Sequence, residues 1–330
     1  MKRILIILLV VPLLLFGQFA KVGSVGAKFL NIGIGTHSMG MAQAFSAVGR
    51  DAEAIFWNPA GIAQVTGTSI FVDRVNHWDD IGVNSVAITQ TIGFAGVFGF
   101  FYSGLTSGQW EETSTDQPEG TNNFVEYRAF QMGITYARFL TDRFAFGVNL
   151  KLIREDYPDF PRNSHDVTGY AMDVGGYYKT GFRDLTIGLS IQHFGPDLKI
   201  SGKYPDYENG QVVNPEEEFE SYPLPIVFRG GLAMNVFEFE QMKAQVAVDL
   251  IHPGDNLERY AIGSELSLLD ILKFRVGYQL GGGVNDGVGA FNFGVGLAQL
   301  TALGGFEVGY SYSYGNVMPS IHRISVVLGL

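Results

Sequence analysis

Segments of about ten residues with alternating apolar and polar side chains run through most of this chain. In residues 144–152, 272–280 and 306–314 every even-numbered residue is large and apolar, and every odd-numbered residue is small, polar or charged. Successive side chains of a β-strand point to opposite faces, so a period of two indicates a strand. These segments therefore predict strands with one apolar and one polar face.

Alternation alone also fits a soluble β-sandwich, but three further features favour a membrane. The segments have the length that a tilted strand needs to cross a bilayer, whereas ordinary strands cluster near five or six residues. Their apolar faces carry no charge, as expected where a lipid-facing Lys or Arg at mid-depth costs about 2–4 kcal/mol. The connections are alternately short and long. The sequence therefore predicts an all-β fold, an antiparallel up-and-down transmembrane β-barrel.

We predict about fourteen strands in a barrel that spans residues 67–330. Their approximate ranges are 67–73, 84–91, 94–103, 126–137, 144–154, 169–179, 185–194, 226–237, 243–251, 259–268, 272–280, 290–298, 306–314 and 322–330. The connections after strands two, four, six, eight, ten and twelve are short, and those after strands three, five and seven are long. An even strand count places both termini and the tight turns on the periplasmic side.

The first residues have the features of a secretory signal peptide. Lys2 and Arg3 precede an apolar stretch, residues 4–16, that is too short to span a membrane. We expect cleavage after Gly17, so that residues 1–17 are the signal peptide. With the strand pattern, this leader predicts the bacterial outer membrane, with outer-membrane lipid around the barrel.

Composition and motif spacing disfavour several classes of function. The formal net charge of −11 argues against nucleic acid as a partner. The chain has no cysteine, its six histidines are scattered, and no metal or phosphate motif is present. We therefore predict no enzyme activity, no catalytic residue, no metal site and no cofactor. The acidic segments 111–119 and 206–220 indicate a solvated rim, with calcium binding as the alternative.

Residues 18–66 do not alternate. Small residues between Gly33 and Ala52 predict a short helix over residues 39–48. Asn58 followed by Pro59 is typical of a helix start, with asparagine as the cap and proline at the first helical position. We expect a compact element, the hatch, inside or under the barrel.

This segment resembles the amino-terminal signature of PorV/PorQ proteins, which are similar to FadL-type outer-membrane transporters. The resemblance rests on residues 29–35, 38–45 and 54–61, of which the last reads Ala-Ile-Phe-Trp-Asn-Pro-Ala-Gly. It implies a hatch over residues 18–66 that fills the periplasmic mouth and is anchored by the hatch motif Asn58, Pro59, Ala60 and Gly61.

In FadL-like barrels that region lies near a lateral opening into the bilayer. Glycine in a strand often marks a bulge or bend, so Gly93, Gly96 and Gly99 would weaken pairing at such a gate. The alternative is that these residues have no special role, because glycine is abundant in every strand.

Charged residues on the polar faces are expected to point into the lumen. The set has both signs and comprises Lys151, Asp249, Glu265, Lys273, Arg275 and Glu307. Unpaired charges are costly in a narrow interior, so we predict a cross-lumen network of ion pairs. A path for solutes is the alternative.

Three functions remain. The PorV/PorQ resemblance implies a non-enzymatic accessory of type IX secretion, whose extracellular loops bind the sorting domains of secreted proteins beside a translocon barrel. The second is a FadL-like transporter of hydrophobic small molecules such as fatty acids or aromatics. The third is an envelope barrel with a structural role alone.

Overall fold

The structure is a computed structural model that describes residues 22–78, 80–158, 165–208, 211–282, 288–301, 304–315 and 318–330. The predicted signal peptide lies outside the described residues. So does the start of the expected hatch, residues 18–21.

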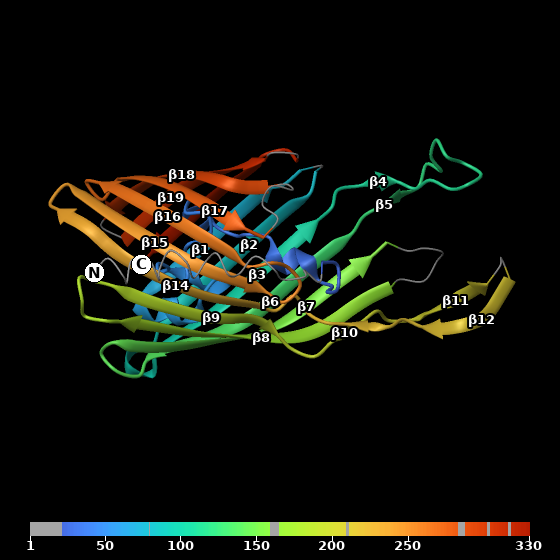
Figure 1. Cartoon of the computed structure of the whole chain (residues 1–330), viewed down its shortest axis with the longest axis horizontal. Coiled ribbons are helices and arrows are strands. Elements are labelled where there is room, and N and C mark those ends of the chain that lie inside the picture. The colour runs from blue at the N-terminus through green and yellow to red at the C-terminus, as the bar shows by residue number, and fades with distance from the viewer. Residues whose placement is uncertain are drawn as a thin grey trace, which may run out of the picture.

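In the described part of the chain, fourteen antiparallel strands form a closed barrel, as predicted (Figure 1). Each barrel strand pairs with its two neighbours in chain order. The strands are β1 (Thr68–Asn76), β2 (Gly82–Thr91), β3 (Val97–Thr106), β6 (Arg128–Phe139), β7 (Phe144–Tyr157), β8 (His165–Lys179), β9 (Thr186–Phe194), β14 (Val227–Phe239), β15 (Met242–Pro253), β16 (Arg259–Leu268), β17 (Leu272–Gly281), β18 (Val288–Thr301), β19 (Gly304–Gly315) and β20 (Ile321–Gly329).

The first and last strands close the wall. β1 pairs with β20 in unbroken register from Ser69 opposite Gly329 to Asn76 opposite His322. Leu330 then donates its N–H to the carbonyl oxygen of Thr68 at 2.8 Å. Closure leaves no strand edge in the wall, which a lipid environment requires because hydrocarbon offers no hydrogen-bond partner.

The two faces of the wall differ as the alternation predicts. On β17 the outward side chains of Leu272, Phe274, Val276 and Leu280 are exposed, whereas the inward side chains of Arg275 and Gln279 are buried. This outward apolar face continues around the barrel. No helix among the described residues is long and apolar enough to cross a membrane, a finding that does not bear on strands.

The two ends of the barrel also differ. At one end, the turn end, short turns join β2 to β3, β6 to β7, β8 to β9, β14 to β15 and β16 to β17. At the other, the loop end, two long connections project beyond the wall (Figure 1). One carries β4 (Trp110–Glu111) and β5 (Phe124–Val125). The other carries β10 (Leu198–Lys199), β11 (Lys203–Glu208), β12 (Gln211–Glu218) and β13 (Ser221–Tyr222).

The strand ranges differ from the predicted ones at one place that matters. β7 and β8 were expected to end at Arg154 and begin at Gly169, but they extend to Tyr157 and His165. The two strands pair over this whole length, from Phe144 opposite Tyr178 to Tyr157 opposite His165. The extension carries the wall further toward the loop end here than the sequence indicated.

The described part of the hatch, residues 22–66, packs against the inner wall. The hatch comprises η2 (Lys28–Asn31), α2 (Thr36–Gly40), η3 (Ala52–Phe56) and η4 (Pro59–Gln64), of which the three η elements are 3₁₀ helices. α2 contacts β17 to β20, η3 contacts β1 to β3, and η4 contacts β6 to β8. The predicted helix over residues 39–48 is wrong: α2 ends at Gly40, and Ala42 and Gln43 have positive φ angles that an α-helix excludes.

Inward-facing glycines make room for the hatch backbone. A Cβ on Gly188 would lie 2.0 Å from the carbonyl oxygen of Ser46, and one on Gly277 would lie 2.3 Å from the carbonyl carbon of Met41. The hatch therefore rests directly on the strand backbone. Many strand glycines are explained by this contact.

A charge placed on the outward face tests the position of the membrane. Val248→Arg, in the middle of β15, is expected to lower the free energy of unfolding by about 2–4 kcal/mol. His252→Arg lies outward on the same strand near its loop end and is expected to cost about 0–1 kcal/mol. Reversible denaturant unfolding in lipid vesicles measures both. Equal effects at the two positions would contradict a hydrocarbon environment at Val248.

Candidate functional site

Asn58 joins the hatch to the wall. Its Oδ1 accepts the N–H of Ala60 at 3.1 Å and caps η4. Its Nδ2 donates to the carbonyl oxygen of Ser46 at 2.8 Å and to that of Gly176 in β8 at 3.1 Å. A Cβ on Gly175 would lie 2.1 Å from Oδ1, so this wall position is confined to glycine. The sequence indicated the cap but not the bonds to Ser46 and to the wall.

Glu53 holds the first half of the hatch together. Its Oε1 accepts the N–H of Ser38 at 2.8 Å, and the side chain is buried. Burial, reinforced by the nearby carboxyl of Asp51, raises the pKa of Glu53 to about 8. Near neutral pH this carboxyl therefore keeps its proton inside the hatch.

Four of the six predicted lumen residues meet near the turn end. The guanidinium of Arg275 donates to Glu265 at 2.6 Å through Nε and to Glu307 at 2.5 Å through Nη2. Lys273 pairs with the second oxygen of Glu307 at 2.5 Å. His37 of the hatch lies 3.1 Å from Glu265. The cluster thus ties β16, β17 and β19 to α2.

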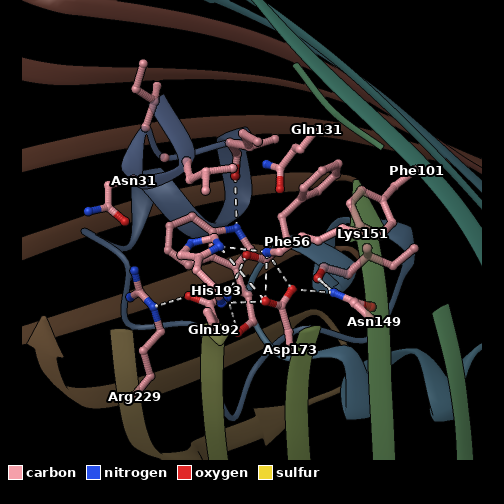
Figure 2. A pocket seen from close by; sticks show the side chains of 16 residues that line it. Asn31, Phe56, Phe101, Gln131, Asn149, Lys151, Asp173, Gln192, His193 and Arg229 are labelled. Carbon is pink, nitrogen blue, oxygen red and sulfur yellow. Dashed lines mark hydrogen bonds and ion pairs between the residues drawn. The ribbon is translucent and has the colours of Figure 1, made fainter. Parts of the chain in front are cut away.

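A second cluster lies in the middle of the lumen (Figure 2). Lys151 of β7 pairs with Asp173 of β8 at 2.7 Å and lies 2.6 Å from Nδ1 of His193 on β9. Asn149 donates to Asp173 at 2.8 Å and to the carbonyl oxygen of Ile55 in the hatch at 2.9 Å. The three strands are therefore bound to one another and to the hatch by one buried polar network.

Asp249, the sixth predicted lumen residue, stands apart from both clusters. It accepts the N–H of Ser46 at 2.9 Å and that of Phe45 at 3.3 Å, so it holds hatch backbone. The two clusters and Asp249 therefore act separately, and the described residues form no single network across the lumen.

The wall between β8 and β9 contains a register break beside the middle cluster. Val174 lies opposite Ile191, but Met172 lies opposite Phe194, so β9 has one extra residue there. His193 takes a φ of +60°, and both it and Gln192 are buried on the inner side. Gln192 donates to the carbonyl oxygens of Phe56 and Trp57 at 2.8 and 2.9 Å. A β-bulge thus aims two consecutive side chains at the hatch.

Beyond this bulge the wall is completed by a loop. β9 ends at Phe194, while β8 continues to His165. Leu198 of β10 is buried against Gly169, where a Cβ would lie 2.1 Å from its Cδ2. Ser201 donates its N–H to the carbonyl oxygen of Asp166 at 2.9 Å. Few ladder hydrogen bonds hold this part of the wall.

A hollow of about 740 Å³, which we call the vestibule, lies between the hatch and the loop end. Its floor is the hatch segment from Gly26 to Gly33. Its lining is mainly apolar and includes five large aromatic side chains, Phe29, Trp78, Trp110, Tyr127 and Tyr157. Such a hollow, with a few polar groups, is typical of a site for a small apolar ligand.

Two arginines supply positive charge to the vestibule. Arg259 and Arg323 line it, and neither forms an ion pair with a carboxylate in the described ranges. Arg323 donates to the carbonyl oxygen of Gly33 at 3.1 Å and to Ser313 at 2.8 Å. The vestibule therefore combines a mainly apolar lining with two arginines and one carboxyl group, that of Glu155.

Below the floor lies an enclosed cavity of about 30 Å³, enough for about one water molecule. Asn31, Ile32 and Gly33 line both this cavity and the vestibule. On the outer surface a groove of about 800 Å³ runs over β6, β7 and β8, with Met132, Leu152, Met172 and Phe194 in its lining. Lys151 lines both the inner cavity and the outer groove. The cavity and the groove therefore lie on opposite sides of β7 at Lys151.

The three glycines predicted to weaken a gate lie at the start of β3 and in the turn before it. Gly93 and Gly96 belong to the turn between β2 and β3, and both have positive φ angles. Gly99 lies within β3, opposite Thr89 and Thr135. β3 pairs with β2 and β6 without a register shift. These glycines stay a prediction.

Sequence reasoning missed several residues that the structure brings together. Asp173 occupies a polar position of an alternating strand, so its inward direction was available from the pattern. His193 was not, because the bulge breaks the alternation. His37, Glu53 and Gln192 acquire their roles only through the path of the hatch. Within the described ranges, no group of three or more His, Asp or Glu side chains is placed to hold a metal ion.

Comparison with known proteins supports the class of fold. No family model and no curated protein matches the chain. Among solved structures, a FadL homologue of Pseudomonas aeruginosa superposes with a TM-score of 0.54 at 11% identity, covering 89% of this chain and 98% of that chain. The toluene transporter TodX of Pseudomonas putida gives 0.52 at 11% identity, covering 86% and 95%.

At such low identity the likeness shows the fold alone, a closed antiparallel barrel similar to those of these two proteins. Membership of the PorV/PorQ family finds no support among these matches and stays a prediction.

Replacing Asn58 tests the anchor of the hatch. Asn58→Asp keeps the Oδ1 cap but removes both Nδ2 donations, so hatch opening is expected to become about 1–3 kcal/mol easier. Amide hydrogen exchange in η4 measures this. Asn256→Asp is the control, because exposed Asn256 uses only its Oδ1. Unchanged exchange in η4 would contradict the assigned role of Asn58.

Glu53 predicts a pH dependence of the hatch. Its pKa is about 8 when folded and 4.5 ordinarily, so the folded state binds the extra proton between these values. The contribution of Glu53 to hatch stability is then fully present below about pH 4.5 and is lost as pH rises toward 8. Protection factors of the Ser38 amide at pH 5 and 8 measure this loss. Glu53→Gln should abolish it, and Glu126→Gln, at a partly exposed carboxylate outside the hatch, should not.

Proposed function

We propose that this protein is an outer-membrane channel for hydrophobic small molecules. The observation that carries the proposal is the aromatic vestibule above the hatch. The fold shared with the FadL homologue and with the toluene transporter supports it. In this proposal the loop end faces outward, and the turn end, with both termini, faces the periplasm.

The vestibule would select its ligand by burial of apolar surface. Removing each CH₂ group from water contributes about 0.8 kcal/mol, so an alkyl chain or an aromatic ring gains far more than a sugar or an ion of equal size. Phe29, Trp78 and Trp110 supply the apolar contact. The cavity below the vestibule floor has room for about one water molecule.

Arg259 would favour ligands with an anionic head. Its Nε is buried without a hydrogen-bond partner in the described structure. A carboxylate is a suitable acceptor for such a guanidinium, because charge-assisted hydrogen bonds are about twice as strong as neutral ones. We therefore expect fatty acids and aromatic acids to bind more tightly than neutral hydrocarbons.

We propose that the ligand leaves through the wall at the bulge between β8 and β9. There the inner cavity and the outer apolar groove share Lys151, and the wall beyond Phe194 depends on a loop. Movement of the hatch floor, Asn31 to Gly33, would connect the vestibule with this cavity. This position differs from the predicted gate at Gly93, Gly96 and Gly99, where strand pairing is regular.

Calorimetric titration with dodecanoate and dodecanol tests the vestibule. Trp78→Ala is expected to weaken both ligands about tenfold, equivalent to about 1.4 kcal/mol of lost apolar contact. Arg259→Gln is expected to weaken dodecanoate and leave dodecanol unchanged. Phe124→Ala, an exposed aromatic outside the vestibule, is the control. Absence of binding by the unmodified protein would sink the proposal.

A disulfide across the proposed exit tests the route. The chain has no cysteine, so Met172→Cys with Phe194→Cys introduces one pair at opposed positions of β8 and β9. Phe274→Cys with Val295→Cys, opposed on β17 and β18, is the matched control. Oxidation of the first pair should stop transfer of dodecanoate into vesicles while binding persists. Equal transfer by both oxidised variants would contradict an exit at the bulge.

One observation favours the secretion role as a second candidate. The ribbons β4–β5 and β11–β12 project from the loop end and offer exposed apolar side chains, among them Phe124, Val212 and Val213. A pull-down with secreted proteins of the same organism tests it. Recovery of proteins with a shared sorting domain, lost on deletion of residues 203–218, would favour that candidate.

A further inference from the structure

Four basic side chains gather on two neighbouring turns at the turn end. Arg138 and Arg143 flank the turn between β6 and β7, and Lys179 and Arg183 flank that between β8 and β9. The turns touch, because Lys179 donates its N–H to the carbonyl oxygen of Arg143 at 2.8 Å. All four side chains are exposed. We call this group the basic turn patch.

None of the four forms an ion pair with a carboxylate in the described ranges. Asp142 and Asp184 lie in the same turns, so the local charge is +2 (four basic minus two acidic residues) in a chain of net charge −11. At the loop end, by contrast, Arg128 pairs with Glu126 at 2.7 Å, and Arg154 pairs with Asp156 at 2.8 Å.

The patch lies at the border of the outward apolar face. Phe144 and Tyr178 are the last outward residues of β7 and β8 before the turns, and both are exposed. Leu140 and Phe182 are exposed at the turn tips, at 61% and 64%. Arg183 lies over the ring of Phe182, 5.8 Å from its centre. Cations beside apolar tips are suited to a membrane surface, where the charge stays among headgroups and the apolar groups enter the acyl region.

The patch geometry suits a phosphate group. Arg143 has room to extend over the neighbouring turn because Gly181 has no side chain: a Cβ there would lie 3.2 Å from Nη1 of Arg143. Nη1 is also 3.5 Å from the carbonyl oxygen of Thr180. A guanidinium held in this way can present its remaining N–H groups to phosphate oxygens, with the ammonium of Lys179 on the adjoining turn.

We propose that the basic turn patch binds the phosphate of an anionic phospholipid headgroup, with Arg143 and Lys179 as the main contacts. Each basic residue near an anionic membrane surface is expected to contribute about fivefold in affinity. The site is independent of the vestibule and of the solute that the barrel carries. It would fix the height of the barrel in the membrane at this side of the wall.

Native mass spectrometry of the full protein in a neutral detergent tests the proposal with phosphatidylglycerol and phosphatidylcholine as probes. We expect the unmodified protein to retain phosphatidylglycerol at least about tenfold more strongly. Arg143→Gln with Lys179→Gln should reduce this preference at least about tenfold. The control, Arg74→Gln with Arg128→Gln, removes the same charge at the loop end and should keep the preference.

Three results would overturn the proposal. The first is equal retention of both lipids by the unmodified protein. The second is an unchanged preference in the turn variant. The third is displacement of phosphatidylglycerol by glycerol 3-phosphate at an equal concentration, which would assign the site to a free phosphate. A change of gel migration on heating confirms that the variants have folded. Arg183→Gln is a milder variant, for which we expect the preference for phosphatidylglycerol to fall about fivefold.

Discussion

The direct contact between hatch backbone and strand backbone is the interaction on which the rest of the interior depends. At Gly188 and Gly277 any side chain would collide with Ser46 or Met41. Because the hatch is seated so closely, Asn58 can bond to β8, Gln192 can reach Trp57, and Asp249 can accept from Ser46. The hatch has little regular secondary structure, so many of its polar groups form hydrogen bonds with the surrounding wall instead.

This seating divides the lumen into levels of different chemistry. The vestibule is aromatic and apolar, the middle is a buried polar network around Asp173, and the level nearest the turns is an ion-pair cluster around Arg275. An apolar ligand would find favourable contact only at the first level. Passage through the charged levels would require breaking paired charges, which is costly in a confined interior. A sideways route at the bulge would leave the lumen at the middle level, so it avoids only the ion-pair cluster around Arg275.

The wall could be predicted from the sequence, whereas the path of the hatch could not. Period-two alternation depends only on neighbours along the chain, and it gave the fourteen strands and the inward direction of Lys151, Glu265, Lys273, Arg275 and Glu307. The bulge at His193 interrupts that period. The helix expected over residues 39–48 fails because tertiary contacts override local propensity: Met41 and Ala42 pack on glycines of β16 and β17, and Ala42 and Gln43 take left-handed conformations. Contacts between residues far apart in the chain produce no periodic pattern in the sequence.

The seam between β1 and β20 joins residues about 250 positions apart, from Ser69 opposite Gly329 to Asn76 opposite His322. Until β20 pairs, β1 and β19 present open strand edges. The chain entropy lost on bringing such distant residues together is offset only when β20 forms its hydrogen bonds. We therefore expect closure of the barrel and its insertion into the membrane to occur together, in one all-or-none step. Loss of β20 alone would leave the other thirteen strands unable to close into a barrel.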